Sequence, residues 1–457
     1  MTNNNQITNN CNSDSTNMDV NLSNQKKEKK SVGILNLFYT NTNYGANLVA
    51  YSLQEIVKKL GFDSKIINFN PSKPQNNTET FLSFEIIKFK QKFLNRTIEI
   101  NKLDDLFKMN LLFDSFITGS DQVWNLKIIR DNYPAYFLKF ADTSKNIISY
   151  AASLGNESIT CSQEITNQIS SYLKRFDAIS VREPFAVDLI KKSFNPNTEP
   201  ICVLDPTLLL EANDYQKIID SEDLDDLPEK YVAFYFLNDR FIEEKYHKSE
   251  SYIKLIKKLN LPDINCYGET IQYLGNFEFK FNSVSKWLNT IKNSSLVFTD
   301  SFHGICFSII FNKNFIFINK DKKLSNRISS LLEKLNIQDR TFEKFEDIDI
   351  LRLYNSPINY YEINQRLKIE KSKSVNYLSN ALNKSLDKDF MLIKLSKSLD
   401  EKNEEIENLK KTNILEISKN IKTYLKLLLW NCWLWIFRRL PAFLQDFIRT
   451  YLKKEKY

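Results

Sequence analysis

Between residues 31 and 215 the chain alternates short apolar runs with segments whose apolar residues recur at helical spacing. Residues 32–39 (VGILNLFY) form a continuous apolar run, which suits a strand buried on both faces. Residues 46–60 then carry apolar side chains every three or four positions, and Gly61 is a stop signal. The same alternation predicts further strands at 64–69, 115–118, 146–151, 178–181 and 201–204, with helices at 164–175 and 183–193. This order predicts an α/β domain of the doubly wound, Rossmann-like type over 31–215.

A second series of the same kind follows the acidic stretch 220–229, which is typical of a linker. Apolar runs predict strands at 231–237, 263–267, 295–299 and 315–319, with helices at 242–259, 283–292, 302–311 and 326–335. We therefore expect a second α/β domain over 230–350. Two such domains in tandem usually bind a ligand between them, at the carboxyl ends of their strands.

The two ends of the chain differ from these domains. Residues 1–30 are polar and rich in Asn, and we expect a disordered leader there. From about residue 363 the strand pattern stops, and residues 364–423 are charged, with apolar residues at roughly helical spacing. This predicts a long amphipathic or coiled-coil helix, through which the protein could form an oligomer.

Residues 424–457 form a basic, aromatic segment. They carry seven basic and two acidic residues, a net charge of +5, and three of the five tryptophans. Their apolar run at 427–437 is too short to span a bilayer. The composition predicts an interfacial segment that lies on an anionic membrane. The alternative is a helix that packs on the body of the protein or on a partner chain.

The remaining 423 residues carry a net charge of only +2, which argues against nucleic acid as a partner. The six Cys form no CxxC pair, so neither a zinc ribbon nor a disulfide framework is supported. With only two His, a metal site is not expected, and no cofactor is predicted. We expect a cytoplasmic protein, peripheral to the inner face of the plasma membrane through residues 424–457.

Several polar segments follow predicted strands and are candidates for the site. The segment 119–125 (GSDQVWN) comes directly after the strand 115–118. Its small residues allow close backbone approach, its polar side chains suit sugar hydroxyls, and its indole could stack on a sugar. The residues are Gly119, Ser120, Asp121, Gln122, Trp124 and Asn125. The alternative is a strand-to-helix turn in which Asp121 is the N-cap and Trp124 is core.

A second candidate, 299–304 (TDSFHG), lies between a strand and a helix, so His303 sits near a helix N-terminus that favours an anion. There His303 could act as a general acid or bind phosphate, or it could be a buried structural histidine. Arg182 also ends a strand and could bind a phosphate or carboxylate, or pair with a local acid. The loop Asn43-Tyr44-Gly45 could line the same cleft or be a plain turn.

Taken in order, the motifs NYGA (43–46), GSDQVWN (119–125), SYAASLG (149–155), SVRE (180–183), LDPT (204–207) and TDSFHG (299–304) resemble the polysaccharide pyruvyl transferase family. The resemblance covers about 31–320. It implies a fold similar to the two-domain glycosyltransferase B type. It also implies transfer of the enolpyruvyl group of phosphoenolpyruvate to a sugar of a cell-surface polysaccharide or its lipid-linked precursor, forming a pyruvate ketal.

By motif, the resemblance places the family's essential His on His303 and its anion-binding Arg on Arg182. In the reaction that we expect, His303 is the catalytic acid or a phosphate ligand, and the candidate catalytic residues Asp121 or Asp300 orient the acceptor. Arg182 holds the phosphate or carboxylate of the donor, with Ser301 and Gly304 beside it as donor-binding residues. Some members carry Arg at the position of Ser301, so the way the donor is held differs there. Two other functions stay open on the sequence: a nucleotide-sugar glycosyltransferase of the same fold, and a non-catalytic membrane scaffold for glycan enzymes.

Overall fold

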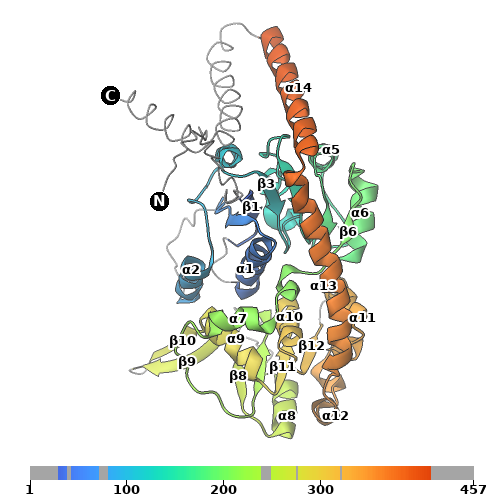
Figure 1. Ribbon diagram of the computed structural model, residues 1–457. Coiled ribbons are helices and arrows are strands. Elements are labelled where there is room, and N and C mark those ends of the chain that lie inside the picture. Colours follow the sequence, from blue (N-terminus) through green and yellow to red (C-terminus); the bar gives the residue numbers. More distant parts are fainter. Residues whose placement is uncertain are drawn as a thin grey trace, which may run out of the picture.

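The structure, a computed structural model, describes residues 29–38, 43–71, 81–237, 249–273, 276–319 and 322–412. The predicted leader (apart from residues 29 and 30) and the predicted interfacial segment 424–457 lie outside the described residues. Figure 1 shows two α/β units one above the other, with two long C-terminal helices along one side. The prediction of two α/β domains with a helical extension is confirmed.

The N-terminal sheet has four parallel strands in the order β2-β1-β3-β4. They are β1 (Ser31–Leu35), β2 (Asp63–Ile66), β3 (Ser115–Thr118) and β4 (Asn146–Ser149). Isolated bridges from Ile148 to Ala178 and from Ala152 to Val181 continue the sheet toward the short parallel pair β5 (Ser180–Val181) and β6 (Ile201–Cys202). The helices of this unit are α1 (Tyr44–Lys59), α2 (Phe81–Phe93), α3 (Leu126–Ile129), α4 (Tyr133–Tyr136), α5 (Gln163–Leu173) and α6 (Pro184–Phe194). Because every pairing is parallel, the carboxyl ends of these strands share one edge.

The C-terminal sheet has five parallel strands in the order β13-β12-β11-β7-β8. They are β7 (Val232–Tyr235), β8 (Asp263–Asn265), β11 (Leu296–Thr299), β12 (Phe315–Ile318) and β13 (Thr341–Phe342). Its helices are α8 (Glu250–Leu259), α9 (Val284–Asn293), α10 (Phe302–Ile310), α11 (Lys322–Leu335) and α12 (Ile350–Asn355). An antiparallel hairpin, β9 (Gly268–Tyr273) and β10 (Asn276–Phe281), stands apart from this sheet and was not predicted.

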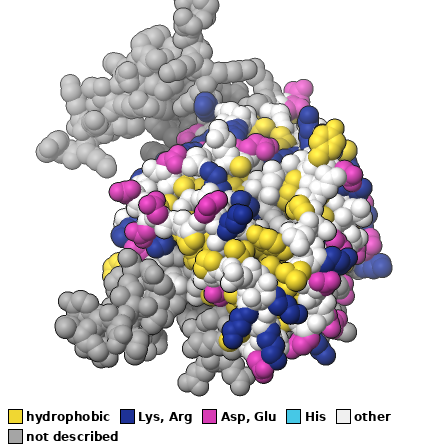
Figure 2. All heavy atoms as spheres, turned by 90° about the horizontal axis from the view of Figure 1, so that it is seen from below, with side chains coloured by type: hydrophobic (Ala, Val, Ile, Leu, Met, Phe, Trp, Pro, Cys, Tyr) yellow, Lys and Arg dark blue, Asp and Glu magenta, His cyan; other side chains and the backbone are white. Residues whose placement is uncertain are grey.

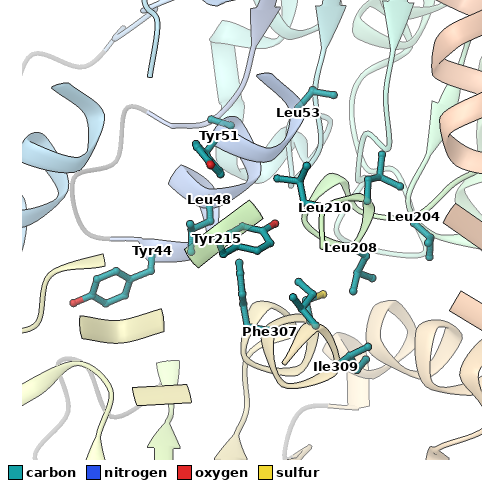
Figure 3. Packing of buried hydrophobic residues seen from close by; sticks show 14 of the residues in the cluster. Tyr44, Leu48, Tyr51, Leu53, Leu204, Leu208, Leu210, Tyr215, Phe307 and Ile309 are labelled. Atoms are coloured by element: carbon teal, nitrogen blue, oxygen red, sulfur yellow. The ribbon is translucent and has the colours of Figure 1, made fainter. Parts of the chain in front are cut away.

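The two units share one continuous hydrophobic core, which includes residues of α1, the 3-10 turn Pro206–Leu209, α7 (Ala212–Ile219), α9 and α10. Figure 3 shows Leu48 of α1, Tyr215 of α7 and Phe307 of α10 pointing toward one another at the junction. The Tyr215 and Phe307 rings meet edge to face at 4.9 Å between centroids. Tyr44, at the start of α1, stacks on Trp287 of α9 at 5.5 Å. Burial of this apolar surface stabilises one relative placement of the two units.

The C-terminal helix α13 (Tyr360–Asn383) packs along both units (Figure 1). Ser374 Oγ accepts a hydrogen bond from Leu204 N at 3.0 Å, and Tyr377 Oη donates to Ser149 O at 2.9 Å. Lower on the helix, apolar residues such as Ile363 and Leu367 are buried in the shared core. The buried apolar face of α13 is therefore packed within the chain, while Ile369 on the same helix is exposed.

The segment predicted as a long amphipathic or coiled-coil helix over 364–423 is described as far as residue 412, and there it consists of two helices. The first helix ends at Asn383, a 3-10 turn follows at Lys384–Leu386, and α14 (Lys388–Thr412) begins after Asp387. The Asp387 carboxylate accepts from the backbone N–H groups of Asp389 and Phe390 at 2.9 and 3.0 Å, so it starts a new helix in the way an N-cap does. No helix in the described part of the chain is long and apolar enough to cross a membrane.

The lower face of the C-terminal unit carries mixed charges. Figure 2 shows Lys and Arg side chains interspersed with Asp and Glu on this face, with apolar side chains between them. A face of this kind lacks the single-sign field that favours a nucleic-acid backbone, which agrees with the small net charge outside residues 424–457.

Tyr44→Phe tests how strongly α1 is tied to the C-terminal unit. Tyr44 Oη donates to Asn282 O at 2.6 Å, and Tyr44 is fully buried. We expect the variant to lower the free energy of unfolding by about 1–3 kcal/mol, because a buried carbonyl loses this donor. Urea unfolding is the measurement, and Tyr361→Phe, at a tyrosine 76% exposed, is the matched control. Equal effects of the two variants would contradict this prediction.

Candidate functional site

The carboxyl ends of strands from both units meet at one place. The segments after β3, β5 and β6 bring Ser120 and Asp121, Arg182 and Glu183, and Asp205 together. From the other unit, the segment after β11 contributes Ser301 and the start of α10, where Phe302 and His303 lie. These side chains form what we call the junction site: Ser120, Asp121, Arg182, Glu183, Asp205, Phe302 and His303.

Asp205 lies at the centre of the junction site, and its side chain has no exposed surface. Its Oδ1 accepts from Thr207 N at 3.0 Å and from Thr207 Oγ1 at 2.7 Å, within its own turn. Its Oδ2 accepts from Ser120 Oγ at 2.9 Å and from Arg182 Nη1 at 3.1 Å. Burial raises the pKa of Asp205, but the charges of His303 and Arg182 and the hydrogen bonds from Thr207 outweigh it, and the pKa lies below its ordinary value.

Arg182 is the cation of the junction site and is also buried. Its Nε donates to Glu183 Oε1 at 3.1 Å, its Nη1 pairs with Asp205, and Asp121 Oδ1 lies 4.0 Å from Nη1. Its guanidinium carbon lies 4.3 Å from the centre of the Phe302 ring. Burial lowers the pKa of Arg182, but the charges of Glu183, Asp205 and Asp121 outweigh burial and raise it above its ordinary value. Arg182 is therefore charged at any physiological pH.

His303 is placed by the N-terminus of α10. Ser301 is the N-cap, and its Oγ accepts from Gly304 N at 3.4 Å. Ser301 N in turn donates to Thr299 Oγ1 at 3.0 Å, so strand β11 and helix α10 are fixed to each other. The imidazole is 8% exposed, and its Nε2 lies 4.0 Å from Asp205 Oδ2.

Two glycines allow this arrangement. A Cβ on Gly45, in the first turn of α1, would lie 2.2 Å from His303 Nδ1. A Cβ on Gly304 would lie 2.2 Å from Thr299 Oγ1. Real side chains do not approach so closely, so only glycine allows α1 to reach the imidazole and α10 to reach β11.

The predicted segment 119–125 divides between the site and the core. Ser120 belongs to the site through its bond to Asp205, and Gly119 lets Asn36 of the β1 end approach. Asp121 has a positive φ of 73° and faces Arg182. Gln122 and Asn125 bond to each other, with Asn125 Nδ2 donating to Gln122 Oε1 at 2.7 Å. Asn125, not Asp121, caps the following helix, α3.

Four predicted site residues have other roles. Trp124 is 1% exposed, stacks on Phe137 at 5.1 Å and donates from Nε1 to Tyr136 O at 3.1 Å, so its faces are closed to a sugar. Tyr44 is packed between the two units and does not line a cleft. Asp300 accepts from Leu237 N at 2.5 Å, at the end of β7. Asn43 is the N-cap of α1, accepting from Ala46 N at 3.2 Å.

Two functional candidates were missed from the sequence. Asp205 and Glu183 complete the charge balance around Arg182, and Ser153 Oγ donates to Glu183 at 2.6 Å. A signal for Asp205 existed, since it directly follows the predicted strand 201–204, and ligands of parallel sheets bind beyond the carboxyl ends of the strands. Glu183 gave no such signal, because an acid next to an arginine is common on protein surfaces.

A small pocket lies beside Arg182. Its volume is about 20 Å³, which is room for one water molecule. Arg182, Asp205, Phe302, Ser330 and Lys334 line it, together with Val203, Leu204, Leu208 and Leu331. Lys334, on α11, donates to Cys202 Sγ at 3.3 Å and lies 3.8 Å from Glu370. The pocket therefore has two cationic side chains and an apolar wall. Residues 29–38, 43–71, 81–237, 249–273, 276–319 and 322–412 contain no cluster of three or more His, Cys, Asp or Glu that could hold a metal ion.

The contact between α1 and His303 can be tested by a double-mutant cycle. We expect Gly45→Ala to lower the free energy of unfolding by about 1–3 kcal/mol, because the new methyl group overlaps the imidazole. In a His303→Ala background, Gly45→Ala should lower the free energy of unfolding much less, because the imidazole ring is absent. Thermal and urea unfolding of the four proteins provide the measurement. Equal costs in both backgrounds would show that the ring and α1 do not meet.

The fold was compared with solved structures. The matches include a protein assigned as UDP-N-acetylglucosamine 2-epimerase from Listeria monocytogenes (10% identity, 79% of this chain and 97% of that chain, TM-score 0.46). They also include the glycotransferase of kitacinnamycin, at 11% identity over 79% of this chain and 100% of that chain, with a TM-score of 0.40. UGT89C1 of Arabidopsis thaliana matches at 11% identity over 77% of this chain and 99% of that chain, with a TM-score of 0.43. All three TM-scores are below 0.5, so nothing about the function of this chain is taken from them. A comparison with curated proteins found no match.

A comparison with family models gave a match that covers the motifs of the junction site. The polysaccharide pyruvyl transferase model matches residues 43–322, which is more than half of the chain and includes Gly45, Asp121, Arg182, Asp205 and His303. The chain therefore belongs to the polysaccharide pyruvyl transferase family, and it is an enzyme of that family.

Proposed function

We propose that this protein forms a pyruvate ketal on a sugar of a cell-surface polysaccharide or its lipid-linked precursor, with phosphoenolpyruvate as the donor. The observation that carries the proposal is the meeting of His303, from one unit, with Arg182 and Asp205, from the other. A proton donor and an anion-binding cation are the two groups that a reaction of phosphoenolpyruvate needs. Family membership supplies the reaction class.

Arg182 is the proposed donor ligand. Two of its three nitrogens already pair with Glu183 and Asp205, as expected from the structural interpretation of this residue. Among the described residues none accepts from its Nη2, and the pocket beside it also holds Lys334. A phosphate or carboxylate in this pocket would meet two cations, with Ser330 and Phe302 beside it, and the carboxylate of Asp205, which is paired with Arg182, also lines the pocket.

His303 is the proposed general acid. Its proton goes to the methylene carbon of phosphoenolpyruvate, which becomes a methyl group, and positive charge develops at C2. One sugar hydroxyl attacks C2, the bond between C2 and the phosphate oxygen breaks, and a second hydroxyl closes the ketal. Of the two hydroxyl protons, one replaces the proton that His303 gave and the other leaves with phosphate. Asp121, which faces the site from β3, is the proposed partner for an acceptor hydroxyl.

The pocket beside Arg182 is too small for the donor. It has room for about one water molecule, and His303 is only 8% exposed. We propose that the segment around α10 moves away from the strand ends of the N-terminal unit to admit substrates, then returns to exclude water. The ion pairs of Arg182 with Glu183 and Asp205 all lie within the N-terminal unit, so this motion leaves them intact.

The acceptor and location are inferred from residues 424–457, which lie outside the described residues. Their net charge of +5 and their tryptophans would place the enzyme on an anionic membrane, where a lipid-linked acceptor is available. This is consistent with a cytoplasmic enzyme on the inner face of the plasma membrane.

A donor screen tests the reaction. The purified protein is incubated with glycan extracted from its own cells and either phosphoenolpyruvate or sugar nucleotides. Phosphate release, with a pyruvate-sized mass gain on the glycan, supports the proposal. Nucleotide release would instead indicate a glycosyltransferase, and no turnover with any donor would favour a scaffold.

His303→Gln should lower turnover by about 100-fold or more, because the amide cannot give up a proton as an imidazolium does. The matched control is His247→Gln, the same change at the other histidine of the chain. Phosphate release under saturating donor is measured for both variants, and far-UV circular dichroism checks the fold. Wild-type turnover in folded His303→Gln would remove His303 from the mechanism.

Deletion of residues 424–457 should release the protein from anionic vesicles. Each basic residue near the surface contributes on the order of 1 kcal/mol, and this contribution weakens with salt. Co-sedimentation of full-length and truncated protein at low and high salt provides the measurement, and neutral vesicles are the control. Equal sedimentation of both proteins would rule out membrane binding through this segment.

A further inference from the structure

The Asp205 carboxylate is held in one orientation by groups from several elements. Thr207 occupies Oδ1 with two hydrogen bonds, and Ser120 and Arg182 occupy Oδ2. Four donors on a fully buried side chain leave it no freedom to rotate. The same Oδ2 lies 4.0 Å from His303 Nε2, across the junction between the two units. This distance is too long for a hydrogen bond but short for two charges in a buried place.

The imidazole is equally restricted on its other sides. Gly45 closes the Nδ1 side, where even a methyl group would overlap the ring. The Phe302 ring meets the imidazole at 87° with 5.3 Å between centroids. His303 therefore keeps its Nε2 near Asp205 for as long as α1 and α10 stay in place.

Acidic side chains outnumber cations on the Asp205 side of His303. Arg182 is surrounded by three carboxyl groups, those of Asp121, Glu183 and Asp205. The other cation at the pocket, Lys334, lies 3.8 Å from a further acid, Glu370. Burial holds the pKa values of the nearby Tyr215 and Cys306 well above their ordinary values, so both stay neutral.

We propose that Asp205 is a positioning residue of the transfer reaction, whose fixed carboxylate acts through its charge on the His303 imidazole across the junction and favours the protonated form. Asp205 donates no proton to the substrate. Its negative charge offsets the positive charge of Arg182, which would otherwise disfavour a second cation within the same buried site. The catalytic consequence rests on the proposed general-acid role of His303, but the electrostatic statement does not.

The test is a histidine titration by NMR. The chain has only two histidines, so protein labelled with ¹³C at histidine Cε1 gives two resonances, and His303→Gln assigns them. The titration midpoint of His303 in the wild-type protein is the reference for the variants. In Asp205→Asn, which keeps the shape but removes the charge, the midpoint should fall by about one pH unit or more.

A matched control separates charge from packing. Thr207→Val removes one hydrogen bond to Asp205 Oδ1 and keeps the carboxylate, so the His303 midpoint should stay at its wild-type value. A midpoint in Asp205→Asn equal to that of the wild type would overturn the proposal. If Asp205→Asn does not fold, Asp205→Ser, which also removes the charge, is titrated in its place, and a midpoint equal to that of the wild type overturns the proposal equally well.

Activity provides the second readout. A general acid works while it is protonated, so turnover should fall as the pH rises through the titration of His303. In Asp205→Asn this fall should begin at a lower pH by the same interval that NMR measures. An NMR shift without a matching shift in the activity profile would support the electrostatic role of Asp205 and reject the general-acid role of His303.

Discussion

A buried guanidinium must be matched by carboxylates, and this constraint organises the junction between the two units. Arg182 cannot lose its charge, and Asp205 is the ionised carboxylate paired with it, while Glu183 accepts from its Nε. The pKa of Asp205 is lowered, so its pairing stabilises the folded state above the ordinary pKa of an aspartate and is lost as the pH falls through the lowered value. Removal of one member would leave a buried charge without compensation. The cluster is therefore rigid, and it provides a fixed electrostatic field for His303.

The shared core and the C-terminal helix limit how the units can move. Tyr44, Tyr215 and Phe307 lie in one hydrophobic cluster that spans the junction, and α13 contacts both units. A wide opening would expose this apolar surface at about 25 cal/mol per Å². The proposed admission of substrate thus has to be a local shift near α10, which leaves the Tyr44–Trp287 stack closed. The same packing that restricts the opening of the site also keeps water out of it.

The sequence predicted both sheets because each central strand is a buried apolar run, as VGILNL and SLVFT show. It also placed Arg182 and His303 correctly at strand ends. It could not tell which face of Trp124 is covered, since a stacking indole and a core indole have the same pattern. The hairpin β9–β10 was missed because no long apolar run marks it. The break before α14 depends on a single aspartate cap, Asp387, within an otherwise helical pattern.

Position 301 shows how local folding and the site are connected. Some members of the family have an arginine there, whereas Ser301 is the N-cap of α10 in this chain, and its hydroxyl is used by Gly304 N. The capped helix fixes the backbone at His303, and the contact of Gly304 with Thr299 fixes the helix on β11. Ser301 therefore helps to fix the orientation of α10, whereas an arginine at this position would add a positive charge. The second cation beside Arg182 comes instead from Lys334 on α11, beyond the segment that matches the family. If this chain binds the same anionic donor, the second positive charge at the pocket comes from Lys334 near the end of α11 and not from the start of α10.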